Sequence, residues 1–292
     1  MNQFVLLAVT MSCSLLGTLS RNHYSKAEMR SSAHNAQFIT WLSLAGLAAL
    51  VVIGAVRGTL TVPSVYTVLL GVVFGGVITA FNLFNSLALK HGPLAYTTLI
   101  MAAAAIIPAL SGAIAFGEVI TWKQVAGTVL MAISVFLAVD RSGNARKASY
   151  RWLLFCLAAF LMNGSIGVLQ KIHQSSDARG ELDMFLIVAF AVSTVFSMLL
   201  TRAPHAEKKE TFGGKALLLA VAAGVFNAGN HVINLYLSGV MDSMIFFPMV
   251  NGVGLLLSIL AAVIVFRERL KKLQWTGIAV GFAAVLLLCG LI

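Results

Sequence analysis

Charged residues are scarce in this chain of 292 residues. Only 10% are Asp, Glu, Lys or Arg, and 59% are hydrophobic, whereas roughly a quarter of an ordinary soluble domain is charged. No charged residue lies near the middle of any of the long apolar runs. This composition excludes an ordinary soluble domain, and it predicts an integral membrane protein.

Cysteine is also rare, and its placement argues against disulfide and metal chemistry. Cys13, Cys156 and Cys289 each lie inside an apolar run, where a thiol behaves as a small hydrophobic group. The sequence has no paired cysteine spacing, no phosphate-binding loop and no dinucleotide fingerprint. We therefore expect no metal, no cofactor, no catalytic residue and no direct use of ATP.

Long apolar runs dominate what is present. Lipid offers the backbone no hydrogen-bond partners, and about 20 helical residues cross the hydrocarbon layer, so runs of this length predict helices. We expect an all-α bundle of ten transmembrane helices. They cover residues 3–20, 36–56, 65–89, 94–116, 122–139, 151–172, 182–201, 214–238, 243–266 and 273–291.

The formal net charge of +10 indicates membrane topology and not a nucleic-acid partner. The basic residues lie in short loops between apolar runs, and most of them follow the odd-numbered runs. The positive-inside rule places those loops in the cytoplasm. Both termini are then expected outside, and the predicted location is a bacterial inner (plasma) membrane.

A stretch of the sequence recurs after 150 positions. Residues 114–127 read IAFGEVITWKQVAG and residues 264–277 read IVFRERLKKLQWTG, with Ile, Phe, Glu, Gln and Gly at matching places. The same offset pairs Gly17 with Gly167. The chain is therefore predicted to be a duplication.

The duplication divides the chain into residues 1–140 and 151–292, joined by a loop over residues 141–150. Each half holds five predicted spans. Because five is an odd number, the second half enters the membrane in the opposite sense to the first. The predicted architecture is an inverted repeat, which is typical of secondary carriers.

These features resemble the EamA-like transporters of the drug/metabolite transporter superfamily, with a Glu after the fourth helix of each half and Gln and Gly opening the fifth. The match comprises Phe116, Gly117, Glu118, Gln124 and Gly127, echoed by Phe266, Glu268, Gln274 and Gly277, and the second copy departs from the pattern with Arg267 where the first has Gly117. The resemblance implies a secondary carrier of small metabolites or drugs, often an exporter, with a central cavity and alternating access. It also implies cytoplasmic termini, in contrast to the charge distribution.

The predicted span 214–238 carries a stripe of polar residues on one helical face. Its members are Asn227, Asn230, His231, Asn234 and Ser238. One interpretation is that they line a water-filled cavity and bind substrate, with His231 carrying a coupling proton or meeting an anion. The alternative is hydrogen bonding between helices, worth about 0.6 kcal/mol per bond on average.

Further substrate-binding candidates lie in other predicted spans. They are Asn82, Asn85, Tyr96, Met101, Asn163 and Asn251, and packing polarity is the alternative explanation for them. Pro108 and Pro248 each remove a backbone hydrogen bond within a span. We interpret both prolines as hinge candidates, because broken helices often mark the binding site of inverted-repeat carriers.

Glu118 and Glu268 lie at the ends of predicted helices, outside the hydrocarbon centre. A carboxylate in this position can cap the positive N-terminus of the following helix. We favour this structural role over proton coupling.

The absence of intramembrane carboxylates also bears on the substrate, because a bare cation would ordinarily need one as its counter-ion. A neutral or zwitterionic polar metabolite fits better. We therefore expect a secondary active transporter working by export, coupled to a proton or an exchanged solute, monomeric within its lipid, and not an enzyme.

Three alternatives remain open at this stage. A flippase would move lipid or lipid-linked substrates, and a passive channel would conduct without coupling. A membrane-embedded transferase would need a reactive cluster at one interface, for which His23, Lys26 and Glu28 are the nearest candidates.

Overall fold

The computed structural model describes residues 3–28, 32–91, 94–138, 149–201, 212–257, 259–260 and 270–290. Within these ranges every regular element is a helix, as predicted. Seven helical stretches of the described residues are long and apolar enough to cross a membrane, one of which, Leu99–Phe116, joins parts of α4 and α5, and three further apolar helices are shorter. These are the features of a helical integral membrane protein.

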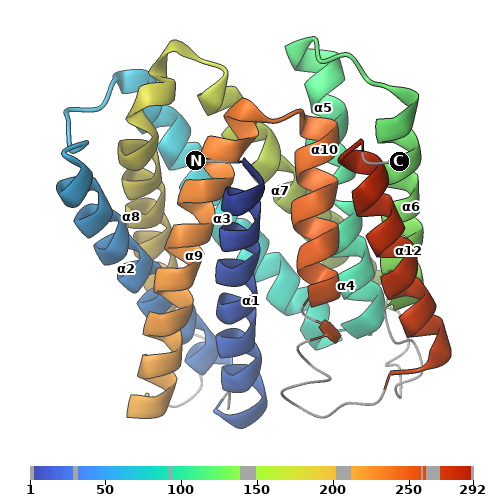
Figure 1. Ribbon diagram of the computed structural model, residues 1–292. Helices are drawn as coiled ribbons and strands as arrows, with labels where there is room; N and C mark the ends of the chain where they lie inside the picture. Colours follow the sequence, from blue (N-terminus) through green and yellow to red (C-terminus); the bar gives the residue numbers. More distant parts are fainter. Residues whose placement is uncertain are drawn as a thin grey trace. The chain divides into compact units, whose positions relative to one another are not determined.

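The helices follow the predicted apolar runs (Figure 1). They are α1 (Gln3–Ala27), α2 (Ser32–Arg57), α3 (Val65–His91), α4 (Leu94–Ala103), α5 (Ile106–Phe116), α6 (Trp122–Ala138), α7 (Tyr150–Gln174), α8 (Leu182–Thr201), α9 (Gly214–Val240), α10 (Ser243–Pro248) and α12 (Lys272–Leu288). A 3-10 turn, η1 (Asp177–Glu181), precedes α8, and a π turn, η2 (Met249–Val253), follows α10. The predicted span 94–116 is divided between α4 and α5.

The chain forms two compact units. Unit 1 comprises Met1–Thr79 and His173–Leu237, and unit 2 comprises Ala80–Ile172 and Ser238–Ile292. Each unit therefore draws helices from both halves of the sequence, and each is described by itself below. Most of the predicted loop between the halves, residues 141–148, lies outside the described residues.

Small residues allow the helices of unit 1 to approach closely. A Cβ atom at Gly75 of α3 would overlap the carbonyl oxygen of Ala189 in α8, and one at Gly224 of α9 would overlap that of Leu42 in α2. Helices in lipid associate largely through such close packing, because burying apolar surface gains little there. The positions of glycine thus determine which helices pack together.

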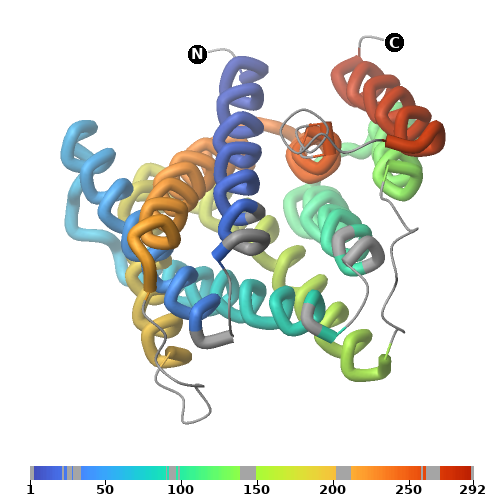
Figure 2. Tube along the Cα trace, turned by 90° about the horizontal axis from the view of Figure 1, so that it is seen from below, coloured from blue at the N-terminus to red at the C-terminus, as the bar shows by residue number. Residues whose placement is uncertain are grey.

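In unit 2, α6 and α12 lie side by side (Figures 1 and 2). A Cβ atom at Gly127 would lie 2.7 Å from Leu288 Cγ, and one at Gly277 would lie 2.6 Å from the Ala138 backbone nitrogen. Gly277 is 150 positions after Gly127, and Leu288 is 150 positions after Ala138. The two contacts are therefore related by the 150-residue offset.

Unit 1 contains a contact between residues separated by the same offset. The hydroxyls of Ser43 in α2 and Ser193 in α8 lie 3.3 Å apart, at a sequence separation of 150. Thr79 of α3 donates a hydrogen bond to Ser193 at 3.1 Å, so all three hydroxyls are joined. The contact between α2 and α8 thus also joins residues that are 150 positions apart.

Candidate functional site

The predicted span 94–116 is interrupted at Ala104 and Ala105, between α4 and α5. Pro108 has no N–H and cannot donate to the carbonyl of Ala104, four residues earlier. That carbonyl instead accepts from the Ile107 N–H at 3.1 Å, and the Ala104 N–H donates to the Met101 carbonyl at 3.3 Å. The break therefore lies one turn before Pro108, where the missing donor has its effect.

Helix α7 provides the surface on which this break lies. A Cβ atom at Gly164 would overlap the Ile107 side chain, and one at Gly167 would lie 2.7 Å from the Pro108 ring. The Asn163 amide of α7 donates to the Met101 carbonyl at 2.9 Å. Asn163 and Met101, both predicted as site residues, are thus joined at the interruption.

A second interruption follows Pro248, where α10 gives way to the π turn η2. A π turn widens the backbone spacing and often occurs at functional sites. The Asn251 amide, inside this turn, donates to the Phe247 carbonyl at 3.0 Å. Because α10 packs against α5, both interrupted helices meet within unit 2.

Two asparagine side chains on α3, in the same unit, have no hydrogen-bond partner among the described residues. Asn82 and Asn85 are half-buried, and neither bonds to any residue in the described part of the chain. Asn85 precedes Ala88 by one turn, and Ala88 is fully buried against Trp152 and Cys156 of α7. These amides therefore retain both donors and acceptors for a solute or water.

The polar stripe on α9 divides into two parts. Asn230 donates to the carbonyl and the hydroxyl of Thr10 in α1, both at 3.0 Å. Asn234 donates to Asn230 Oδ1 at 3.0 Å, and Thr10 donates to Asn234 Oδ1 at 2.9 Å. These three side chains form a closed network between two helices, which agrees with the interhelical interpretation. A substrate role for either amide stays a prediction.

Asn227 and His231 do not join this network. His231 lies edge-on to Phe74 and Phe190, with ring centroids 6.0 and 5.6 Å away. Its Nδ1 atom is buried and has no hydrogen-bond partner among the described residues. Asn227, one turn earlier, has no bonded partner among the described residues. Ser238, the last member of the stripe, is fully buried and belongs to unit 2.

The remaining candidates are placed as follows. Tyr96 lies in α4, but its side chain is outside the described part. The hydroxyl of its neighbour Thr97 is buried and accepts from Trp152 Nε1 at 2.9 Å. Unit 2 contains the candidates on α3, α4, α5, α7, α10 and η2. Unit 1 contains the α9 candidates Asn227, Asn230, His231 and Asn234.

Glu118 has a structural role in unit 2. Its carboxylate accepts from the backbone N–H of Ser243 at 2.8 Å and from the Ser243 hydroxyl at 3.1 Å. The Lys171 ammonium forms an ion pair with it at 2.5 Å. The Glu118 side chain is only 15% exposed and the Lys171 side chain only 9%. Gly112 leaves room for the carboxylate, because a Cβ atom there would overlap it.

Glu118 therefore caps a helix, as predicted, but that helix is α10 and not the following helix α6. The first turn of α6 uses Gln124, whose Oε1 accepts from the Thr121 N–H at 2.8 Å. Gln274, 150 positions later, accepts from the Lys271 N–H at 2.9 Å in the same manner. Glu268 lies outside the described residues.

Sequence reasoning missed several residues that shape these sites. Thr10 and Lys171 were not singled out, since each gains its role from a partner far along the chain. Gly164 and Gly167 lie three residues apart in an apolar helix, and that spacing was the one available signal for a close helix contact.

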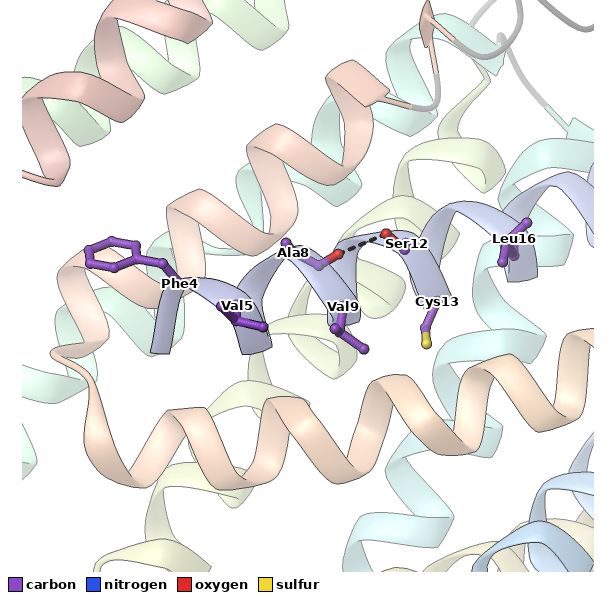
Figure 3. Close-up of a pocket in the computed structure, with 7 residues that line it drawn as sticks. All are labelled: Phe4, Val5, Ala8, Val9, Ser12, Cys13 and Leu16. Atoms are coloured by element: carbon purple, nitrogen blue, oxygen red, sulfur yellow. Dashed lines mark hydrogen bonds between the residues drawn. The ribbon is translucent and has the colours of Figure 1, made fainter. Parts of the chain in front are cut away.

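A shallow groove of about 480 Å³ lies along one face of α1 (Figure 3). Its lining is Phe4, Val5, Ala8, Val9, Ser12, Cys13 and Leu16. The one hydroxyl, that of Ser12, donates to the Ala8 carbonyl at 2.8 Å (Figure 3). The groove therefore offers an apolar surface and little that would recognise a polar solute.

Comparisons with known proteins define the fold but not the activity. No family model matches the chain. A Haemophilus influenzae protein described only as uncharacterized is 22% identical over 182 residues, which is 61% of this chain and about 60% of that protein's length. A solved structure, described only as "Crystal structure of protein", covers 99% of this chain and 96% of its own, with 17% identity and a TM-score of 0.79. The chain shares that fold.

Proposed function

We propose that the protein is a secondary transporter that exports a small polar solute, neutral or zwitterionic, across a bacterial inner membrane. The observation that carries the proposal is the packing of two interrupted helices, α4–α5 and α10–η2, against each other. An asparagine amide bonds to a backbone carbonyl at each interruption. Discontinuous helices of this kind form the substrate sites of many inverted-repeat carriers.

The reciprocal contacts support an arrangement of ten helices as two inverted repeats. In a twofold-symmetric interface, a contact from i to j is matched by one from j to i. The contact of Gly127 with Leu288 is matched in this way by the contact of Gly277 with Ala138. Ser43 and Ser193 bond directly across 150 positions. These pairings are expected if a duplicated chain places its halves about local twofold axes.

In the proposed mechanism, some asparagine side chains bind the solute and others join helices. Asn82 and Asn85 form no hydrogen bond within the described residues, so they are the residues expected to hydrogen-bond the solute. Asn230 bonds to Thr10 and joins α1 to α9. The interruptions at Ala104 and after Pro248 are the points where backbone angles change most cheaply as access alternates.

The test compares Asn85, which is unbonded within the described residues, with Asn230, which bonds to Thr10. Asn85→Ala is expected to weaken solute binding about two- to tenfold with little loss of stability, because it removes one or two hydrogen bonds to the solute. Asn230→Ala is expected to lower stability by roughly 1 kcal/mol and to leave binding intact, because it breaks the Thr10 network. Thermal unfolding of the purified protein against amino acids, nucleosides, sugars, amines and organic acids measures both effects.

Uptake and efflux of the solute that binds are then measured in liposomes, with Asn230→Ala as the matched control for Asn85→Ala. Solute flux that Asn85→Ala slows and Asn230→Ala preserves supports the proposal. Binding lost equally in both variants, or no flux of any bound solute, contradicts it.

The groove on α1 favours a second candidate, a lipid flippase, because an apolar surface on a membrane helix suits an acyl chain. Transfer of a fluorescent phospholipid between leaflets distinguishes the two. Lipid transfer without solute flux would replace the proposed transporter by a flippase.

A further inference from the structure

Arg21, in the last turns of α1, has no bonded partner among the residues that the structure describes. It is half-buried, and no hydrogen bond or ion pair joins it to any residue that the structure describes. The Arg57 side chain of the same unit, in contrast, pairs with Asp183 at 3.5 Å although it is 52% exposed. An ionisable group buried within a membrane bundle is costly to keep and usually has a functional role.

The contacts between α1 and α9 place the Arg21 side chain. Thr10 bonds to Asn230, and Gly17, two turns later, faces Phe226, so the helices run antiparallel. A long side chain on a helix points back toward the N-terminus of its own helix. Arg21 therefore extends toward the level of Gly17 and of Asn227, the residue after Phe226.

The same register brings His231 toward this level, because it follows Asn227 by one turn on the same face of α9. Its ring lies edge-on to Phe74 and Phe190, and its buried Nδ1 atom has no hydrogen-bond partner among the described residues. The Asn227 amide is also unbonded within the described residues. The pairing of α1 with α9 therefore brings three polar side chains to neighbouring levels of unit 1, each with hydrogen-bonding capacity that no described residue uses.

We propose that Arg21, Asn227 and His231 form a binding site for an anionic oxygen group, with a carboxylate as its fitting ligand. The planar guanidinium fork binds two carboxylate oxygens in parallel, and the amide supplies a further donor. The phenyl rings lower the local dielectric and strengthen the attraction. If the proposed transport function holds, this site receives the carboxylate of a zwitterionic solute.

Thermal unfolding of the full chain in detergent tests the site, with sodium acetate and acetamide as probes at constant ionic strength. The two probes have nearly the same shape, and only acetate carries the charge. We expect a saturable rise of the unfolding midpoint with acetate and none with acetamide. Arg21→Gln is expected to weaken acetate binding about tenfold to a hundredfold, because it removes charged hydrogen bonds.

Arg151→Gln is the matched control, because Arg151 is an exposed arginine at the start of α7. It is expected to leave the acetate response unchanged. Arg21→Lys serves if Arg21→Gln fails to fold, since lysine retains the charge and loses the fork. An acetate response that survives in the Arg21 variants, or that the wild-type protein lacks, overturns the proposal.

A parallel measurement with inorganic sulfate distinguishes a carboxylate ligand from an inorganic oxyanion. A stronger response to acetate supports a carboxylate ligand, and a stronger response to sulfate overturns that part of the proposal. Solute flux without an acetate response leaves the transporter proposal intact and the anion site wrong. An acetate response lost in Arg21→Gln, in a protein that moves no solute, supports the site and contradicts the transporter.

Discussion

Replacing Lys171 with methionine is expected to lower the free energy of unfolding by about 3–5 kcal/mol, the loss typical of breaking one partner of a buried ion pair. Lys171 is almost completely buried and pairs with the Glu118 carboxylate, which in turn caps α10 through Ser243. Methionine fills a similar volume but leaves that carboxylate without its cation. Unfolding of the purified protein by a denaturing detergent measures the loss.

The double variant Glu118→Gln with Lys171→Met separates charge from packing. Glutamine keeps an oxygen for the N–H of Ser243, so a neutral pair is expected to recover much of the stability lost in Lys171→Met. Lys215→Met, at an exposed position at the start of α9, is the control and is expected to change stability by less than about 0.5 kcal/mol. A Lys171→Met variant as stable as this control would show that the ion pair contributes nothing.

Gly75→Val is expected to separate α3 from α8 and to destabilise the protein by at least about 1–3 kcal/mol, the usual cost of overpacking. The added side chain would overlap the backbone carbonyl of Ala189, and a carbonyl within a helix cannot move aside. Loss of the contact would also pull Thr79 away from Ser193, one turn further along the same face. The midpoint of thermal unfolding measures the effect.

The neighbouring residue provides the control for this substitution. A Cβ atom at Gly76 would meet only a carbon of the Phe196 ring at 3.6 Å, which is an ordinary van der Waals distance. Gly76→Val is therefore expected to be tolerated. Equal destabilisation by both substitutions would indicate a general effect of valine in α3 and would contradict the packing argument.

Much of the fold was predictable because helix formation in lipid depends on local composition. Each of the ten apolar runs contains a described helix, and the ends differ mainly where polar residues extend the helix, as α1 does to Ala27. Pro108 marked the interrupted span, although the break itself lies one turn earlier at Ala104. The recurrence after 150 positions has the same spacing as the Ser43–Ser193 contact.

The candidate site was less predictable, because the role of a polar residue depends on what packs against it. Asn85 and Asn230 look alike in the sequence, yet one is unbonded within the described residues and the other bonds to Thr10 across 220 positions. Helical spacing assigned the α9 residues to one face but did not identify their neighbours. Only the structure shows that Asn230 and Asn234 bond to α1, whereas Asn227 has no bonded partner among the described residues.

The sequence by itself determined that this is a helical membrane protein and which apolar runs form helices, and Pro108 marked the run that is interrupted. These properties depend on residues close together in the chain. The tertiary structure alone decided that Glu118 caps α10, that Lys171 neutralises it, and that Arg21 has no protein counter-ion among the described residues. Each of these depends on which distant helix lies within the few ångströms over which hydrogen bonds and ion pairs act.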